Sequence, residues 1–541
     1  MSILTYTLFA TLFSIAIYRL SRIGQRPKGY PPGPPTLPLI GNLHLMPKEK
    51  THLQFKKWAD EYGPVYSLML GTMVMVVLGS DQAVKDLLDK RSGIYSSRPD
   101  HYLANVASGG LRMALMPYGD TWRMIRKIIH FNLNVKVATS YVPYQDLENK
   151  ALLVGLLETP EHFADHVRRF TGSFTTQMIY GFRTTRIDDP KLIQLFEGVE
   201  KMSQVHGKTT AALLDLYPIL RWLPDAFLPE RRYAKHLHKE SSELYVGHWL
   251  DVKKKIKNGT ASSCFCVDLA RAQEEENFSD ELAGYISGSV LEAGADTTAA
   301  EIISFVQSMI LFPDVAKAAQ EELDRVCGNR LPTLEDWPNL PYINGCIKET
   351  LRCMPTVISG APHALIQDDE YMGYKIPKGA GVLPNNWTIH NDPKRHPDPR
   401  RFDPTRYIDD QQSAAESANN PDPSKRDHFG FGAGRRICQG MHIAERSLFL
   451  TMARLLWAFN ISPARDNNGK EIIPERDDFT EGVLAQPKPF PASITPRDEK
   501  KAAIIREEWE KAETLLDEEQ QWKTVPGDLV RKDSKDVLEK A

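Results

Sequence analysis

The 541-residue chain has few cysteines and almost no excess charge, and each shortage excludes some classes of function. Its six cysteines are too few and too scattered for a disulfide framework. They indicate a reducing compartment, where an isolated cysteine of special role acts as a ligand or a nucleophile. The formal net charge of −3 gives no support to a nucleic-acid partner, and we expect none. Glycine- or serine-rich linkers and internal repeats are also missing from the interior, which favours one large domain.

The N-terminal end differs in character from the rest of the chain. Residues 3–18 carry no charge at all. Four basic residues follow at once, namely Arg19, Arg22, Arg26 and Lys28. The apolar run is slightly shorter than the ~20 residues that span a bilayer. A cleaved signal peptide is the alternative, but its basic residues would precede the apolar run. We therefore predict a transmembrane anchor at residues 1–20, with the remainder of the chain on the cytosolic side.

The remaining chain is predicted to have three parts. Residues 21–38 are basic and rich in proline, which excludes a helix and predicts a stiff linker. Residues 39–496 form the main domain. Residues 497–541 are dominated by Glu, Asp and Lys, and we interpret this charged C-terminal extension as a solvated helical appendage.

Helical periodicity dominates the main domain. The longest stretch with apolar residues at three- and four-residue spacing extends from Asp280 to Leu311, long enough to cross a whole domain. Strand-like runs are few and short, and one of them covers Tyr371 to Ile376. The predicted fold class is therefore mainly α with a minor β-sheet.

One cysteine stands in a specific motif. Residues 429–440 read FGFGAGRRICQG, in which Phe431, Gly434, Arg436, Cys438 and Gly440 fit the pattern F-x-x-G-x-R-x-C-x-G. The glycines permit a sharp turn against a planar ligand, and the following helix start stabilises a thiolate. Phe431 can shield the sulfur, and Arg436 can pair with a carboxylate of the ligand. A dinucleotide fingerprint fails because its third glycine would fall at Arg435. An inert core cysteine is the other alternative, and five matched positions disfavour it.

On these residues the chain resembles the cytochrome P450 superfamily of haem-thiolate monooxygenases, from the N-terminal run to about Pro496. The resemblance implies the cytochrome P450 fold, a single large helical domain with an N-terminal anchor. It also implies haem (iron protoporphyrin IX) with Cys438 as the axial ligand of the iron. Trp122 and Arg126, which form W-x-x-x-R, and His363 would bind the haem propionates together with Arg436.

Two further motifs agree with that resemblance. The predicted long helix contains the sequence Ala-Gly-Ala-Asp-Thr-Thr at residues 293–298. Glycine and tandem threonines are unfavourable in a helix, so either close helix packing or function accounts for them. In the family, Asp296 and Thr297 deliver protons to oxygen, and Gly294 leaves room for it. Glu349 and Arg352 form an E-x-x-R on a helix, where surface pairs are common. The resemblance joins them with Arg406 in a buried structural network.

The resemblance also predicts the partners. This chain has no flavin or nicotinamide domain, so electrons would come from NADPH through a partner flavoprotein, NADPH-cytochrome P450 reductase, with cytochrome b5 as a second donor. Basic residues such as Arg123, Lys127 and Arg435 could receive its acidic face. The enzyme would be held in the endoplasmic reticulum membrane by its single anchor, with a cytosolic catalytic domain.

The substrate is the least constrained prediction. The segments that would line the pocket are mostly small or apolar, as at Ala107, Ile286, Val290 and Val357, so an apolar small molecule is expected. The spacer resembles that of fungal microsomal enzymes related to O-methylsterigmatocystin oxidoreductase. This favours oxidation of a secondary metabolite such as a polyketide, terpenoid or alkaloid. Oxidation of xenobiotics or small aromatic compounds is an alternative, and a haem-binding sensor without turnover is another, which Asp296 and Thr297 disfavour.

Overall fold

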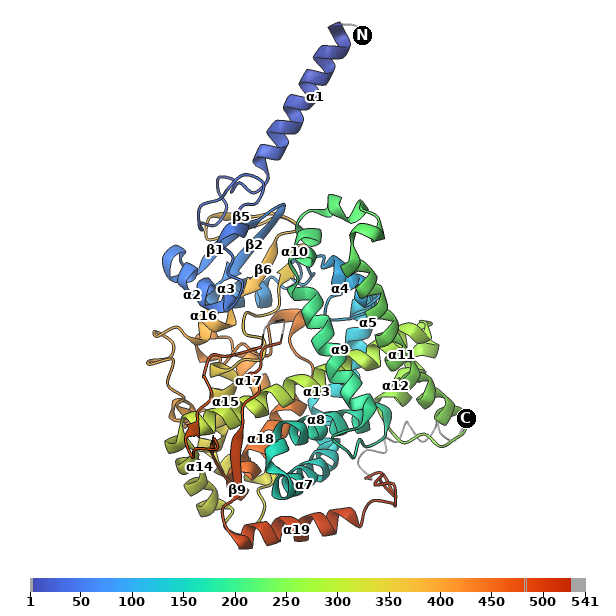
Figure 1. The fold of residues 1–541 in the computed structure, drawn as a ribbon, viewed down its shortest axis with the longest axis vertical. Coiled ribbons are helices and arrows are strands. Elements are labelled where there is room, and N and C mark those ends of the chain that lie inside the picture. The colour runs from blue at the N-terminus through green and yellow to red at the C-terminus, as the bar shows by residue number, and fades with distance from the viewer. Residues whose placement is uncertain (1–2, 481, 483, 527–541) are drawn as a thin grey trace.

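The helices of the protein surround one long central helix (Figure 1). The coordinates are those of a computed structural model, and the structure describes residues 3–480, 482 and 484–526. The central helix is α13 (Asp280–Leu311), and its bounds are those that the periodicity predicted. It packs against α8 (Phe163–Tyr180), α11 (Pro229–Lys257) and α18 (Met441–Ala458), while α7 (Val142–Glu158) completes the layer by packing on α8 and α18.

Apart from α1 (Ile3–Arg22), the other helices lie around this core. They are α2 (Thr51–Tyr62), α3 (Asp81–Val84), α4 (Tyr102–Ala107), α5 (Asp120–Leu133), α6 (Val135–Ser140), α9 (Pro190–Gly207), α10 (Thr209–Leu216), α12 (Phe265–Glu276), α14 (Pro313–Val326), α15 (Pro341–Cys353), α16 (Asn386–His390), α17 (Ala414–Asn419) and α19 (Glu499–Glu513). The largest apolar cluster lies where α13, α14, α15 and α18 meet. A second cluster joins α5, α8 and the first half of α13, so the central helix is buried on nearly all sides.

Three small sheets complete the fold. Their strands are β1 (Val65–Leu70), β2 (Met73–Leu78), β3 (His363–Ala364), β4 (Asp369–Tyr371), β5 (Tyr374–Ile376), β6 (Gly381–Pro384), β7 (Phe459–Arg465), β8 (Glu471–Ile472) and β9 (Ala492–Pro496). The first sheet has the order β1-β2-β6-β3, with β2 parallel to β6 and the other pairs antiparallel. The prediction of a mainly α domain with a minor β-sheet is confirmed.

One predicted strand is wrong in its extent. The run from Tyr371 to Ile376 is not a single strand but part of the antiparallel hairpin β4-β5. Met372 and Gly373 both have positive φ angles, of 53° and 78°. Two consecutive residues with positive φ form a tight two-residue hairpin turn, which reverses the chain between the strands.

The N-terminal helix α1 projects away from the body of the molecule (Figure 1). Its apolar side chains are largely exposed, for example Leu8 at 59% and Phe13 at 68%. Within the described part of the chain, no single helix reaches the length and mean hydropathy of a membrane span, and α13 with α14 do so only as a pair bent by 106°.

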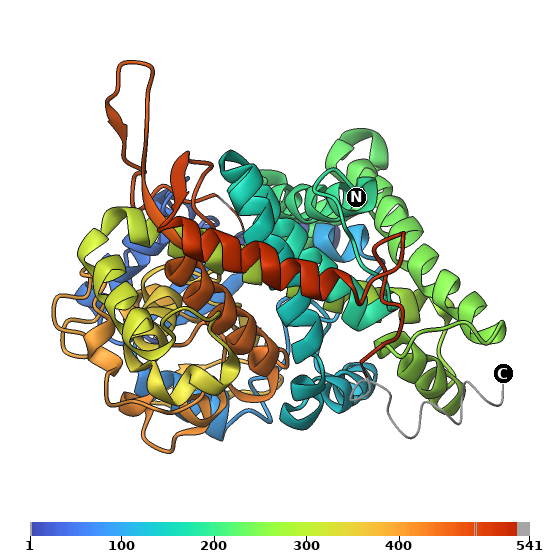
Figure 2. The ribbon, with the colours of Figure 1, turned by 90° about the horizontal axis from the view of Figure 1, so that it is seen from below.

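The charged C-terminal extension does not stand free in solvent, so the prediction of a solvated appendage is wrong for residues 499–526. Helix α19 lies across α7 and the end of α18 (Figure 2). Its inner face carries the buried side chains of Ala502, Ile505 and Ala512, and Leu516 is buried just beyond it. The composition of the extension predicted exposure to solvent, because its few inward-facing apolar residues are outnumbered by charged ones. Residues 527–541 of the predicted extension lie outside the described residues.

Candidate active site

Cys438 lies at the end of a tight loop that leads into α18. The backbone N–H of Cys438 donates a hydrogen bond to the Phe431 carbonyl at 2.8 Å, which closes the loop. Gly434 has φ +60°, and a Cβ at this position would lie 1.9 Å from the Leu88 carbonyl oxygen. Its N–H also donates to the Asp89 carboxylate at 2.7 Å. Glycine is therefore required at 434 because the loop packs against the segment 85–90, and not only because of a planar ligand.

The Cys438 side chain is accessible, whereas the other five cysteines are buried. It lines a cavity of about 160 Å³ together with Phe431, Val357, His363 and Arg436. Burial raises the pKa of the Cys438 thiol, and the backbone N–H groups of Gly440 and Met441 and the Arg126 guanidinium oppose that shift. These donors lie at the start of α18, where the helix dipole also favours a negatively charged sulfur.

Three partly buried arginines form a cationic cluster beside this cavity. Arg436 donates to the carbonyl oxygens of Ser96 at 2.8 Å and Met116 at 2.7 Å. Arg126 donates to the Ile437 carbonyl at 2.6 Å, and Arg98 reaches the carbonyls that precede His363. Burial lowers the pKa of Arg98 and Arg126 to about 10 and that of Arg436 to about 9. All three therefore remain charged at neutral pH.

This cluster has no internal counter-ion. Within the described residues, none of Arg98, Arg126 and Arg436 forms an ion pair with a carboxylate, and all of their hydrogen bonds go to backbone oxygens. Trp122 lies between two of them, with its ring centroid 4.2 Å from the Arg436 guanidinium and 5.8 Å from that of Arg126. Buried charges are stable only when they are compensated, so this arrangement requires an anionic ligand.

Two neutral side chains belong to the same cluster. The indole N–H of Trp122 is buried and has no hydrogen-bond partner in the part of the chain that the structure describes. His363 donates through Nδ1 to the Tyr95 carbonyl at 2.7 Å, and burial lowers its pKa to about 3, so the ring is neutral and its one N–H is already used. An unpaired buried N–H is costly unless a ligand completes it. A planar haem with two carboxylates fits this set, because the arginines and the Trp122 indole would hold its propionates and Cys438 its iron, whereas the predicted propionate contact of His363 would need a second proton on its ring.

On α13, the turn that contains Asp296 and Thr297 is partly exposed, although the helix after it is buried. Ala293 is exposed although the residues from Thr298 to Ile310 are all buried. The Thr297 hydroxyl donates to the Ala293 carbonyl at 2.6 Å. Burial raises the pKa of Asp296 to about 6, with Glu292 adding to the shift and Arg168 opposing it. A carboxyl with such a pKa exchanges protons readily near neutrality, which suits proton delivery.

The glycine in this turn has a structural role. A Cβ at Gly294 would lie 3.0 Å from the Thr175 side chain of α8. The side of Gly294 that a side chain would occupy therefore faces a neighbouring helix, so close packing accounts for the glycine directly.

Behind the cavity, the structure brings Glu349, Arg352 and Arg406 together. Arg352 binds both carboxylate oxygens of Glu349, at 2.7 and 2.6 Å, and also donates to the His390 carbonyl at 2.7 Å. Arg406 Nε lies 3.3 Å from the same carboxylate, and the Asp403 N–H donates to it at 2.9 Å. Glu349 and Arg352 are fully buried, so this network joins α15 to the segment 398–407.

Arg98 was not among the haem-binding residues predicted from the sequence. It follows Ser97, which pairs with Ala364 in an isolated β-bridge and so places Arg98 beside His363. The sequence around it, Ser-Ser-Arg-Pro-Asp, has no periodicity that would have revealed this contact. The cavity also includes Val357, as predicted, whereas Ile286 and Val290 are buried in a hydrophobic cluster.

Comparison with known proteins agrees with this site. Residues 31–493 match the sequence profile of the family Cytochrome P450. Cytochrome P450 monooxygenase virE of Hypocrea virens is 56% identical over 96% of this chain and 94% of its own length. Cytochrome P450 monooxygenase fogE of Aspergillus ruber is 52% identical over 96% of both chains.

Solved structures agree on the fold. A zebrafish cytochrome P450 solved with progesterone superposes with a TM-score of 0.68 at 22% identity, covering 82% of this chain and 99% of that one. Haem bound through a cysteine thiolate is the cofactor that the family implies, and the cationic cluster and Cys438 are built to hold it. The chain therefore belongs to the cytochrome P450 family, and it is an oxidoreductase of the monooxygenase type.

Proposed function

We propose that this enzyme inserts one oxygen atom from O2 into an apolar small molecule in the biosynthesis of a fungal secondary metabolite. The observation that carries the proposal is the accessible Cys438 sulfur, which faces a cavity flanked by three uncompensated arginines. When bound, haem supplies the oxygen-activating chemistry. Cys438 would donate electron density to it. Asp296, with a pKa of about 6, would pass protons to Thr297.

The first test removes the cysteine that is proposed to bind the haem iron. In Cys438→Ser, the carbon-monoxide difference band of a thiolate-ligated ferrous haem should disappear, because serine provides no thiolate. Cys327→Ser is a matched control, since Cys327 is buried at the end of α14 and does not line the cavity. A band retained in Cys438→Ser would show that another residue binds the iron.

The second test is turnover of a panel of polyketide, terpenoid and alkaloid precursors with ¹⁸O2. Label from O2 should enter one product, and products without label would exclude monooxygenation.

We propose that the electrons come from NADPH through a separate membrane flavoprotein reductase. Arg123, Lys127 and Arg435 are exposed close to the segment that carries Cys438, and they suit an acidic partner. Charge reversal of Lys127 and Arg435 to Glu should lower reductase-driven turnover at low ionic strength while the haem spectrum stays unchanged. Equal turnover of the unmodified enzyme and of the variant with Lys127 and Arg435 both changed to Glu would exclude this surface as the reductase-binding site.

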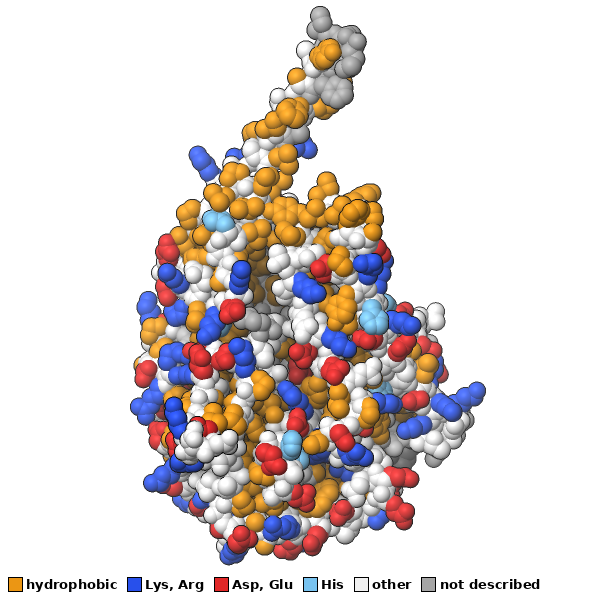
Figure 3. All heavy atoms as spheres, in the orientation of Figure 1, with side chains coloured by type: hydrophobic (Ala, Val, Ile, Leu, Met, Phe, Trp, Pro, Cys, Tyr) orange, Lys and Arg blue, Asp and Glu red, His pale blue; other side chains and the backbone are white. Residues whose placement is uncertain are grey.

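We further propose that the protein is bound to the endoplasmic reticulum membrane through α1, with its body in the cytosol. Supporting this, an apolar surface lies beside the base of α1 in Figure 3. The segment after α10 carries Ile219, Trp222 and Phe227, which are 78%, 89% and 72% exposed. The Tyr217 hydroxyl of this segment donates to the Leu39 carbonyl, beyond the end of α1, at 3.0 Å. Large exposed apolar groups of this kind mark an interaction surface. The chain lacking residues 1–22 should still float with liposomes, and Trp222→Asp with Phe227→Asp should abolish that residual binding. A truncated chain that never floats would limit the membrane contact to α1.

A further inference from the structure

A buried ion pair lies between the loop after α4 and the central helix. Arg112 Nη1 is 2.8 Å from Glu292 Oε2, and Arg112 Nη2 donates to Glu292 Oε1 at 3.0 Å. The Tyr245 hydroxyl of α11 donates to the same carboxylate. Glu292 is buried, and it directly precedes Ala293, which is exposed although the rest of α13 around it is mostly buried. The pair therefore lies one residue before the exposed turn of the central helix.

The Arg112 guanidinium is only partly used in this pair. It has five N–H donors, of which two bind Glu292. The other three have no partner among the residues that the structure describes, and 13% of the side chain remains accessible. Burial disfavours the charged guanidinium, but Glu292 and Tyr245 outweigh that effect and raise the pKa of Arg112. Arg112 is thus a fixed cation with free donors.

The loop that carries Arg112 is held in place from its other side. Arg436 donates to the carbonyl oxygens of Met113 and Met116, and Arg98 donates to that of Ala114. These are two of the three arginines of the cationic cluster. The loop is therefore fixed between the haem-binding cluster and α13, and the orientation of Arg112 is set before a substrate arrives. Donors that are positioned in advance give orientation at little entropic cost.

We propose that Arg112 donates a hydrogen bond to an uncharged oxygen of the substrate, a carbonyl or a hydroxyl, and so orients an otherwise apolar molecule beside α13. This inference rests on the proposed function. The Arg112–Glu292 pair also predicts the charge of the substrate. Because Glu292 already compensates the Arg112 charge, Glu292 would repel a substrate that carries a carboxylate. A neutral acceptor gains the hydrogen bond from Arg112 without that repulsion. Glu292 is a positioning residue that holds the guanidinium and selects against acids.

The test uses haem-loaded ferric enzyme and imidazole probes that ligate the iron and extend a ring from it. The probes are 1-phenylimidazole, the 3- and 4-isomers of (imidazol-1-yl)acetophenone, and the matching benzoates. In the unmodified enzyme, the better acetophenone isomer should bind on the order of 10-fold more tightly than 1-phenylimidazole, as one hydrogen bond to a charged donor predicts. The benzoates should bind more weakly than the acetophenones.

The double variant Arg112→Met with Glu292→Gln removes both charges together and leaves no buried charge unpaired. It should bind 1-phenylimidazole as before but lose the preference for acetophenone. The exposed Arg186, paired only with Asp188 at the surface, provides the control Arg186→Met, which should keep the preference. In Glu292→Gln alone, the uncompensated Arg112 should favour the benzoates over the acetophenones.

Two results would overturn the inference: no acetophenone preference in the unmodified enzyme, or a preference that persists in the double variant. If the double variant fails to bind haem, the inference is tested by the relative affinities of Glu292→Gln for the benzoates and the acetophenones. If Glu292→Gln still binds the benzoates more weakly than the acetophenones, the role of the pair is refuted. These binding measurements need no turnover. A failure of the proposed function would instead appear as a missing thiolate band or as products without ¹⁸O.

Discussion

At the scale of single residues, the hydroxyl of Thr297 illustrates how the site is prepared. Its proton is donated to the Ala293 carbonyl one turn earlier, so its oxygen lone pairs are left to accept a proton or a hydrogen bond from outside the helix. Neighbouring Asp296, whose pKa is raised to about 6 by burial, is in exchange with solvent protons near neutral pH. In the proposed proton delivery, Asp296 would be the donor and the Thr297 hydroxyl the path.

Thr297→Ala should therefore uncouple oxygen consumption from product formation. Removing the hydroxyl leaves the helix intact, since Ala is a better helix former than Thr. We expect at least several-fold more hydrogen peroxide per NADPH oxidised, measured with the reconstituted reductase, and roughly 10-fold less product. Thr297→Ser keeps the hydroxyl and should restore most of the coupling. Unchanged coupling in Thr297→Ala would refute its role in proton delivery.

Residue-level prediction from sequence is possible where local spacing carries the chemistry. The pattern that includes Cys438 can be recognised because its loop, its glycine and the following helix start are contiguous in the chain. Arg98 could not be found in this way, because it reaches the cationic cluster through a β-bridge between Ser97 and Ala364. The sequence left packing and function both open for Gly294, and only the packing of α8 against α13 shows which side chain it faces.

At the scale of elements, a buried carboxyl links the central helix to two segments near the cavity. Glu301 of α13 accepts hydrogen bonds from the backbone N–H of Thr356 at 2.9 Å and from its hydroxyl at 2.7 Å. The Thr356 carbonyl in turn accepts from the Ala485 N–H at 2.7 Å. The second oxygen of Glu301 is buried without a partner among the described residues. Burial therefore raises the pKa of Glu301 to about 7.

This link predicts a pH-dependent stability. The protonated carboxyl is favoured in the folded chain, so its contribution is complete below pH 4.5, the ordinary pKa, and is lost as the pH rises through about 7. The shift corresponds to about 3 kcal/mol. Glu301→Gln mimics the protonated acid and should match the unmodified protein at pH 5 but exceed its free energy of unfolding at pH 8 by roughly that amount.

Urea denaturation followed by tryptophan fluorescence at the two pH values measures this difference. The matched control is Glu243→Gln, because Glu243 is exposed on α11 and should give no pH-dependent gain. A Glu301→Gln variant whose advantage is the same at pH 5 and pH 8 would show that Glu301 does not titrate in this range.

Element-level prediction was most accurate for long, periodic segments. The bounds of α13 follow from its hydrophobic spacing and from Ser279, whose side chain caps the helix by accepting the Leu282 N–H. The sheet formed by β7, β8 and β9 was not predicted, because Phe459–Arg465 pairs with Ala492–Pro496 across a long connection. Such pairings depend on the whole fold and leave little local signal.

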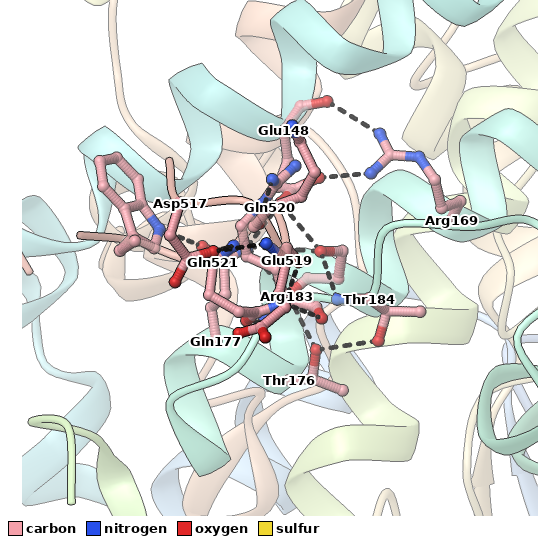
Figure 4. A network of polar contacts seen from close by, with 12 residues as sticks. Glu148, Arg169, Thr176, Gln177, Arg183, Thr184, Asp517, Glu519, Gln520 and Gln521 are labelled. Atoms are coloured by element: carbon pink, nitrogen blue, oxygen red, sulfur yellow. Dashed lines mark hydrogen bonds and ion pairs between the residues drawn. The ribbon is translucent and has the colours of Figure 1, made fainter. Parts of the chain in front are cut away.

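At the scale of the whole molecule, the C-terminal segment closes the side of the bundle away from the cavity. Arg183 donates to the carbonyl oxygen of Gln520 at 2.6 Å and also binds the fully buried Glu148 at 2.6 Å (Figure 4). Arg169 pairs with the same carboxylate. The Trp522 indole N–H donates to Gln177 of α8 at 2.6 Å. The charged extension thus completes a buried polar network in α7 and α8.

The same segment is anchored along its length by partly buried ion pairs. Arg497 and Lys501 both bind Asp324 of α14, at 2.5 and 3.1 Å, and Lys150 of α7 binds Glu508 at 3.0 Å. Their carboxylates remain partly open to solvent, which screens the pairs and keeps each contribution small. The larger contribution comes from the apolar face of α19, where Ile505 and Leu516 are buried against the bundle.

Truncation after Pro496 should therefore destabilise the whole enzyme. It would expose the surface beneath α19 and leave the Arg183 guanidinium without its Gln520 acceptor, at a cost of roughly 5 kcal/mol in the free energy of unfolding. The thermal midpoint of haem release, followed by the carbon-monoxide difference band, should fall clearly. A chain ending at Pro526 keeps these contacts and should match the full-length protein.

The midpoint of Trp522→Ala should lie between those of the truncated and full-length chains, because this change removes one hydrogen bond and one aromatic contact, that with Tyr144 at 5.6 Å. Equal midpoints for all four chains would mean that the docked segment makes no net contribution, and that the bundle of α7, α8, α13 and α18 is stable without it.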